Sequence, residues 1–501
     1  MKQAQHGLRR RAHSGRPSSM KNLFITKPVH AEPHVVAGEE VSLAKTLNWR
    51  HLIMLGIGAV IGAGIFVITG TAAAEHAGPA IILSFVFAGI ACAFAALCYA
   101  EFSAMIPVSG SAYSYTYSTL GEAVAWFVGW SLVLEYLFAA STVAVGWAGY
   151  TLSFLDQFGL HLPAALREAP FTFKHEEFVW TGAWFNLPAV LIIGAIAMLC
   201  YRGIKESATV NAVIVALKVG VVLLVVIFGA HYVHPDNWHP FIPENQAPGV
   251  YGWSGVFRGA SIVFFAYIGF DAVSTAAQEV KNPQRDMPIG IMGSLFICTL
   301  LYIAMAAVLT GMLPYTKLGT AEPVATALAA VPQLAWLKTA AELAAIAGLS
   351  TVILVMMMGQ PRIFYAMAND GLLPKTFGKV HPKFRTPHRA TVIVAVIAAV
   401  MAAFLPISLL GDVVSMGTLV AFATVSAGVL ILRYTQPDLK RSFRVPMAIL
   451  VCPLGVLACL ALIWIMPLRN WLILLVWTVI GFVVYFSYGY KHSKLRKAQQ
   501  S

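Results

Sequence analysis

The chain has 501 residues, of which 58% are hydrophobic and 11% charged, and its mean hydropathy is +0.74. A soluble protein of this length needs a polar surface that this composition cannot supply, so the lipid bilayer must surround most of the molecule. The net charge of +12 does not indicate nucleic-acid binding, because Lys and Arg lie in the tails and in short segments between apolar runs.

Residues 1–44 are basic and polar, without a secretory cleavage pattern, and predict a disordered cytoplasmic tail. The apolar runs that follow are continuous and do not alternate, which favours helices over a membrane β-barrel. With about 20 residues needed for each crossing, they predict twelve transmembrane spans. These spans are 51–73, 80–106, 124–155, 187–203, 208–231, 253–279, 288–313, 337–367, 390–406, 409–433, 446–466 and 470–489.

The positions of the basic residues predict the orientation. Of the 34 Lys and Arg residues, 26 fall in segments on the side of the N-terminus and five in segments on the opposite side. The positive-inside rule therefore predicts that both termini are cytoplasmic, in a multi-pass protein of the cell membrane, most simply a bacterial inner membrane.

The spacing of unusual spans predicts an internal repeat. Glycine interrupts the first span near Gly62 and the sixth near Gly269, and the third and eighth spans are both unusually long. A unit of five helices returns upside down in its second copy, and interrupted helices at matching positions are typical of transporter sites. We therefore predict an all-α membrane fold with inverted repeats at 45–232 and 253–435, two further spans in 446–489, and a cytoplasmic tail at 490–501.

The first span contains four glycines, Gly56, Gly58, Gly62 and Gly64. Each weakens a helix by roughly 1 kcal/mol. The amides at Gly62, Ala63 and Gly64 would then lie at the positive end of a half-helix and bind a carboxylate. The alternative is close packing between helices through small residues.

The sixth span contains the segment Phe264–Asp271, with Gly269 as its one glycine. Asp271 is an ionisable group at membrane depth and is expected to support the site, because such a group is costly without a partner. The main-chain carbonyls of an unwound segment here would accept the ammonium group of an amino acid.

Lys218 is the one charged residue between Ala212 and Ala230 of the fifth span. A fixed charge at this depth costs about 2.5–3.5 kcal/mol on insertion scales. A buried lysine that gains and loses a proton would couple transport to the proton gradient. The alternative is that its side chain reaches the membrane surface.

Glu135 is the one ionisable residue of the third span between Glu122 and Asp156, and we expect it to face the interior. There it would act on a cation, a proton or a substrate amine. The alternative is a protonated carboxyl group that hydrogen-bonds a neighbouring helix. The sequence predicts no cofactor, no metal site and no enzymatic centre, and it contains no Walker A motif.

Several motifs together resemble the amino acid–polyamine–organocation superfamily, specifically its cationic amino acid transporter branch. They are Gly56–Phe66, Leu134–Tyr136, Val145–Trp147, Phe264–Asp271, Glu279–Pro288, Arg362–Pro374 and His381–Pro387. The resemblance covers nearly the whole chain after about residue 40.

This resemblance implies the inverted-repeat (LeuT-like) fold and a set of site residues. The substrate carboxylate would bind at the first interruption and its amine on carbonyls at the sixth. Phe265 would also be the gate that caps the site from outside, and Lys218 would replace the sodium ion of sodium-coupled relatives. The implied substrate-binding residues are Val60, Ile61, Gly62, Ala63, Gly64, Glu135, Phe265, Ala266, Tyr267 and Ile268.

The sequence thus predicts a proton-coupled symporter that takes up cationic or a broad range of amino acids by alternating access. Its expected partners are the amino acid, protons and the lipid bilayer, with no nucleic acid, and it would be a monomer or a weak oligomer. One alternative is an obligate amino acid exchanger of the same fold. Another is a membrane sensor that binds amino acids and uses residues 1–40 as its effector.

Overall fold

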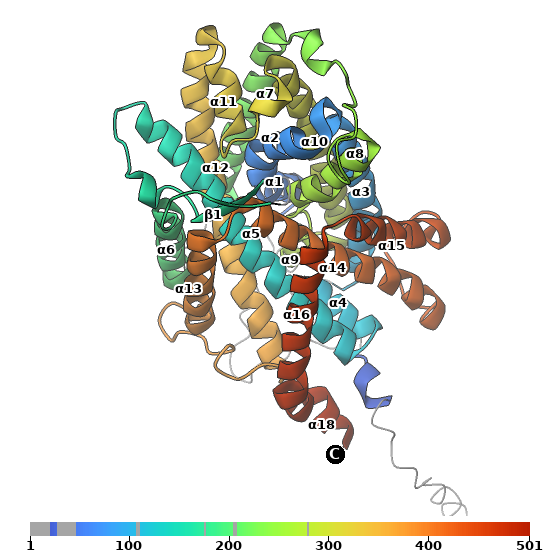
Figure 1. Ribbon diagram of the computed structural model, residues 1–501. Coiled ribbons are helices and arrows are strands. Elements are labelled where there is room, and N and C mark those ends of the chain that lie inside the picture. Colours follow the sequence, from blue (N-terminus) through green and yellow to red (C-terminus); the bar gives the residue numbers. More distant parts are fainter. Residues whose placement is uncertain are drawn as a thin grey trace, which may run out of the picture.

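The computed structural model describes residues 21–27, 47–106, 111–174, 177–203, 208–277 and 280–500. Most of the predicted N-terminal tail, and Glu279 in one motif, lie outside these residues. The described chain is a bundle of helices with one short hairpin (Figure 1). The α-helices are α1 Trp49–Val60, α2 Thr69–Ala72, α3 Ile81–Met105, α4 Ser111–Thr119, α5 Glu122–Asp156, α6 Leu187–Arg202, α7 Ala208–Gly229, α8 Gly252–Val263, α9 Ala272–Thr275, α10 Pro283–Met312, α11 Pro323–Ala329, α12 Ala335–Asn369, α13 His388–Phe404, α14 Ile407–Thr435, α15 Ala448–Trp464, α16 Leu468–Val484, α17 Tyr490–His492 and α18 Lys494–Gln500. The strands are β1 Phe171–Lys174 and β2 Glu177–Trp180.

Seven helical stretches of the described chain are long and apolar enough to cross a membrane, and four shorter apolar helices accompany them. Each predicted span is helical over most of its described residues, and the first and sixth are interrupted. The protein is therefore an all-helical, multi-pass membrane protein. The count of twelve crossings and the inverted repeat stay predictions.

Local signals explain where the helices begin and end. The Asn48 side chain accepts the Arg50 amide at 3.0 Å at the start of α1. The Asn186 side chain accepts the Ala189 amide at 3.1 Å at the start of α6, and Gly203, with φ of +73°, ends that helix. These are the residue types that satisfy unpaired main-chain groups at helix ends.

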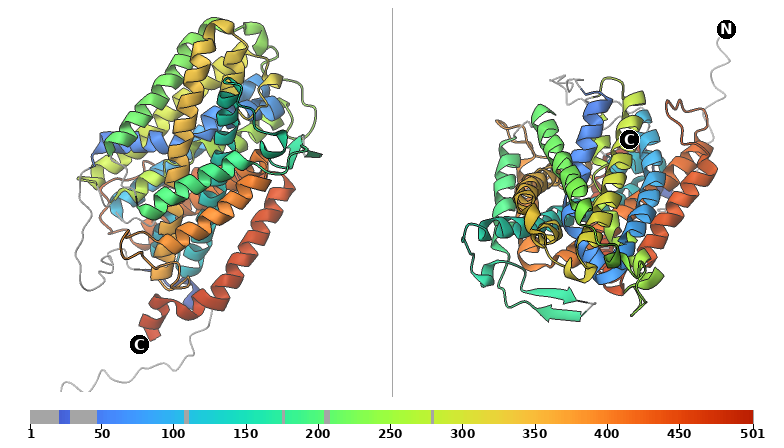
Figure 2. Two further views of the ribbon diagram at one scale, coloured as in Figure 1. Left: turned by 90° about the vertical axis from the view of Figure 1, so that its left-hand side faces the viewer. Right: turned by 90° about the horizontal axis from the view of Figure 1, so that it is seen from above.

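Helix α5 lies at the centre of the bundle, where it packs on α4, α6, α12, α13 and α14 (Figure 1). Helices α5 and α12 are both 35 residues long, as predicted for the third and eighth spans. Helix α16 runs along the edge of the bundle (Figure 2). It is tied to α5 by two hydrogen bonds, one from the Trp130 indole to the Trp477 carbonyl (2.8 Å) and one in the reverse direction (2.9 Å).

The connection between α5 and α6 contains the hairpin β1–β2, which the sequence analysis did not predict. Two strands of four residues are too short to give a periodic signal that stands out from the surrounding loop. The hairpin projects outward from the helices (Figure 2).

Candidate functional site

The first predicted span is interrupted at its glycine-rich segment. Helix α1 ends at Val60, and Ile61 is extended, with φ of −72° and ψ of 98°. The chain becomes helical again at Gly64, where the π-helical segment η2 (Gly64–Ile68) begins. The interruption leaves the last carbonyls of α1 and the first amides of the following segment without helical partners inside the first predicted span.

The sixth predicted span is interrupted as well. After α8 the chain tightens into the 3₁₀ segment η8 (Phe264–Tyr267), and Ile268 is extended. Gly269 has φ of +122°, and a Cβ there would lie 2.8 Å from the carbonyl carbon and oxygen of Ala59. Glycine is therefore required here by both its backbone conformation and its closeness to the end of α1.

The two interruptions contact each other directly. A Cβ on Gly64 would overlap the Cα and Cβ of Ala266. The Tyr302 hydroxyl of α10 lies 2.7 Å from the Val60 carbonyl and 2.7 Å from the Ala266 carbonyl. A hydroxyl has one proton, so it donates to one of these carbonyls at a time. Sequence reasoning missed Tyr302, although a phenol in an apolar span was a signal that could have found it.

Lys218 of α7 is completely buried and reaches the first interruption. Its ammonium group donates to the Gly58 carbonyl at 2.9 Å and to the Ile61 carbonyl at 3.2 Å. The carbonyl end of a helix is negative and favours a cation. The alternative that Lys218 extends to the membrane surface is therefore wrong, because the side chain turns into the bundle.

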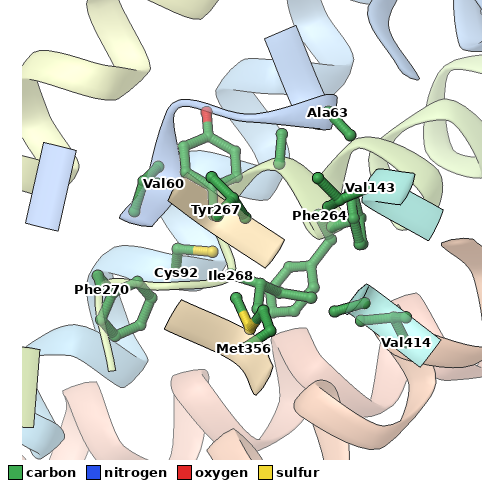
Figure 3. Packing of buried hydrophobic residues seen from close by; sticks show 14 of the residues in the cluster. Val60, Ala63, Cys92, Val143, Phe264, Tyr267, Ile268, Phe270, Met356 and Val414 are labelled. Carbon is green, nitrogen blue, oxygen red and sulfur yellow. The ribbon is translucent and has the colours of Figure 1, made fainter. Parts of the chain in front are cut away.

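A small cavity of about 10 Å³ lies between the interruptions, roughly the space that one water molecule needs. Residues from α1, α5, α12 and the two interruptions converge there, as Figure 3 shows for Val60, Ala63, Val143, Ile268 and Met356. The side chains that line it are apolar. The complete lining is Ala59, Val60, Gly62, Ala63, Gly64, Ala139, Val143, Phe265, Ile268, Val352 and Met356.

Six of the ten predicted substrate-binding residues line this cavity, and four do not. The four are Ile61, whose carbonyl holds Lys218, then Glu135, Ala266 and Tyr267. The Tyr267 hydroxyl instead donates to the Phe85 carbonyl at 2.8 Å. Sequence reasoning missed the apolar residues of α5 and α12. Ala139 and Val143 follow Glu135 at intervals of four and share its helix face, which was the available signal.

The two predicted acids lie beside the cavity lining. Asp271 accepts the Gly269 amide at 3.2 Å and the Tyr136 hydroxyl at 3.3 Å, so it holds the turn of the second interruption. Glu135 is 1% exposed, and neither carboxyl oxygen has a hydrogen-bond partner among the described residues. The adjacent Thr418 gives its hydroxyl proton to the Val414 carbonyl at 3.0 Å. The alternative of a protonated Glu135 that hydrogen-bonds a neighbouring helix stays a prediction, because the Thr418 hydroxyl oxygen of α14 can accept from it.

A wide vestibule of about 900 Å³ lies beyond the cavity. Ile262 of α8 lines the vestibule and Phe265, one helical turn later, lines the cavity, so Phe265 lies at the boundary between them. Charged groups surround the vestibule. Arg258 donates to Asp412 at 2.6 Å, and Arg469 approaches the same carboxylate oxygen at 3.4 Å.

The segment directly before α11, residues 319–322, lines one side of the vestibule. A Cβ on Gly149 would lie 2.7 Å from the Ala321 Cβ, and one on Gly70 would overlap Pro323, so both glycines make room for the α11 segment. Glu322, directly before α11, is partly buried. Burial and the nearby Glu342 carboxylate raise the pKa of Glu322 from 4.5 to about 7, against the smaller lowering effects of Lys338 and Arg167.

We expect the packing of α11 to depend on pH. Because packing raises the pKa of Glu322, protonation favours the packed position. This stabilisation is complete below about pH 4.5 and is lost as the pH rises through about 7. Hydrogen exchange over residues 319–329, corrected for intrinsic rates, should be slower at about pH 6 than at about pH 8. Glu322→Gln should be protected at both, and the exposed control Glu244→Gln should behave like the wild type. Equal protection of the wild type at both pH values would contradict this expectation.

The family model described as amino acid permease matches residues 47–487. The methylthioribose transporter of Bacillus subtilis (strain 168) is 49% identical over 478 residues, which cover 95% of this chain and 100% of the relative. The branched-chain amino acid permease BcaP of the same strain is 47% identical over 481 residues, which cover 95% of this chain and 99% of the relative.

The plant relatives are more distant. The vacuolar cationic amino acid transporter 4 of Arabidopsis thaliana is 39% identical over 397 residues, which cover 79% of this chain and 64% of the relative. The comparisons therefore support the predicted superfamily and do not single out its cationic branch.

Proposed function

Because the chain belongs to the amino acid permease family, whose members are transporters rather than enzymes, we propose that it takes up small or branched apolar amino acids together with protons. The observation that carries this proposal is the meeting of two interrupted helices around an apolar cavity. In this proposal both termini are cytoplasmic and the vestibule opens to the outside of the cell membrane. The equal lengths of α5 and α12 support twelve spans with a five-plus-five inverted repeat.

The main chain is proposed to hold the part that all amino acids share. The amides that begin at Gly62 lie at the positive end of a helical segment and suit a carboxylate. The Val60 and Ala266 carbonyls share the single proton of Tyr302. One of the two is therefore available to an ammonium group at any time.

The cavity lining supports an apolar substrate side chain. Val143, Val352 and Met356 form its wall, and Glu135 is absent from the lining, so no acidic group of that wall would pair with a lysine or arginine substrate. The similarity to a branched-chain amino acid permease points in the same direction. Methylthioribose, named in the other bacterial relative, is the second candidate substrate.

Opening and closing are proposed to alternate around this cavity. At about 10 Å³ it is too small for an amino acid, so the surrounding helices must separate for binding. Phe265, at the boundary with the vestibule, would be the gate. Lys218 would carry the coupled proton, because the charged ammonium group donates stronger hydrogen bonds to the Gly58 and Ile61 carbonyls than the neutral amine would, and so ties α7 more firmly to α1.

Purified protein in liposomes tests the proposal. An imposed pH gradient without internal substrate should drive leucine uptake by a symporter, whereas an obligate exchanger needs internal amino acid. Unlabelled valine, isoleucine and leucine should compete with the labelled leucine, and arginine, lysine and methylthioribose should not. Competition by arginine or methylthioribose alone would overturn the proposed substrate class.

Met356→Ala should shift the substrate preference towards bulkier side chains. Removing this side chain from the cavity wall enlarges the apolar end of the site, and one extra or missing methylene group in an apolar pocket is worth about 10- to 200-fold in discrimination. We expect phenylalanine to gain at least about tenfold as a competitor relative to valine. The matched control is Met358→Ala on the same helix, which does not line the cavity and should keep the wild-type order of competitors. An unchanged order in Met356→Ala would contradict the assignment of this wall.

A further inference from the structure

The hairpin β1–β2 carries all of its aromatic residues on one face. Its strands are antiparallel, with Phe171 opposite Trp180 and Phe173 opposite Phe178. Residues directly opposite each other share a face, and so do residues two apart. The Phe171 and Phe178 rings stack with centroids 5.0 Å apart, and Phe178 meets Trp180 edge to face at 5.1 Å.

This aromatic face is only partly covered by protein. The Arg469 guanidinium of α16 lies 4.5 Å from the centroid of the Phe173 ring on β1. On β2, Phe178 is 50% exposed and Trp180 is 72% exposed. A two-stranded hairpin is marginally stable in water by itself, so its apolar face needs a further surface to cover it.

The surroundings of the hairpin indicate what that surface is. Trp184, three residues before α6, is 71% exposed, and Trp464, the last residue of α15, is 80% exposed. Leu468, the first residue of α16, is 74% exposed and precedes the arginine that holds Phe173. The hairpin therefore lies between the ends of apolar helices, at the level where tryptophans mark the boundary between membrane and water.

We propose that the aromatic face of the hairpin β1–β2 inserts into the interfacial region of the lipid bilayer at the vestibule end of the bundle. The exposed apolar side chains at the ends of neighbouring helices, Trp184, Trp464 and Leu468, favour lipid over a second protein copy as its partner. Phe171 and Phe173 also line the vestibule. The lipid contact thus anchors one wall of the vestibule, independently of which solute is transported.

Depth-dependent quenching tests this proposal. Trp180→Cys is labelled with an environment-sensitive maleimide fluorophore in nanodiscs of phosphatidylcholine. The six native cysteines are buried, so wild type treated with the same maleimide should stay unlabelled and serves as the blank. Glu244→Cys, exposed in the loop before α8, is the aqueous control. Quenchers are a nitroxide near the lipid headgroup and iodide in water.

The nitroxide should quench the probe at position 180 at least about twofold more than the probe at position 244, and iodide should show the reverse order. Equal iodide quenching at both positions would overturn the proposal. Protection of position 180 from both quenchers would also overturn it, because protein would then cover the face. If the labelled variant does not fold, the intrinsic tryptophan fluorescence in brominated lipid replaces the label. Bromine should quench the wild type more than Trp180→Phe, and equal quenching of the two would overturn the proposal.

Discussion

Lys218→Ala is expected to abolish accumulation driven by a pH gradient. One proton that moves down a gradient of about one pH unit releases about 1.4 kcal/mol, which supports about tenfold accumulation of a co-transported solute. Without the ammonium group that joins α7 to the Gly58 and Ile61 carbonyls, no proton is linked to the first interruption. The accumulation ratio in liposomes should therefore fall about tenfold, to about one.

Two further measurements give this prediction its meaning. The exposed Lys317→Ala should accumulate leucine like the wild type. Thermal unfolding of Lys218→Ala should show a folded protein of lower stability, because an unsatisfied buried carbonyl costs about 1–3 kcal/mol. Wild-type, pH-dependent accumulation by Lys218→Ala would remove the lysine from the coupling mechanism.

Gly64→Ala is expected to reduce transport at least about tenfold. The added Cβ would overlap the Cα and Cβ of Ala266, and a backbone atom cannot turn away as a flexible side chain can. The two interruptions would be pushed apart, at the overpacking cost of about 1–3 kcal/mol. Both the rate of leucine uptake and the unfolding temperature should fall.

Gly194→Ala is the matched control for this substitution. Gly194 lies within α6, where an added Cβ meets no atom within 4 Å. Alanine is a better helix former than glycine, so this variant should be as stable as the wild type or slightly more so, with unchanged transport. Wild-type rates in Gly64→Ala would show that the close contact between the interruptions is not needed for function.

The sequence by itself determined that the protein is a membrane protein, and it predicted that the first and sixth spans are interrupted. Both conclusions rest on local properties: the length of apolar runs, the weak helix propensity of glycine in 56–64, and the cost of ionisable groups in lipid. The same properties singled out Lys218 and Glu135, since a charge in an apolar span stands out whatever surrounds it.

Only the tertiary structure decided what these residues contact. Lys218 and the Ile61 carbonyl are 157 positions apart, and nothing local distinguishes a lysine that reaches the membrane surface from one that turns inward. The sequence did not reveal the apolar cavity wall either, because Val352 and Met356 are apolar like the lipid-facing residues beside them on the same helix. Which face of a uniformly apolar helix points inward depends on packing against distant segments, since lipid and protein interior favour the same side chains.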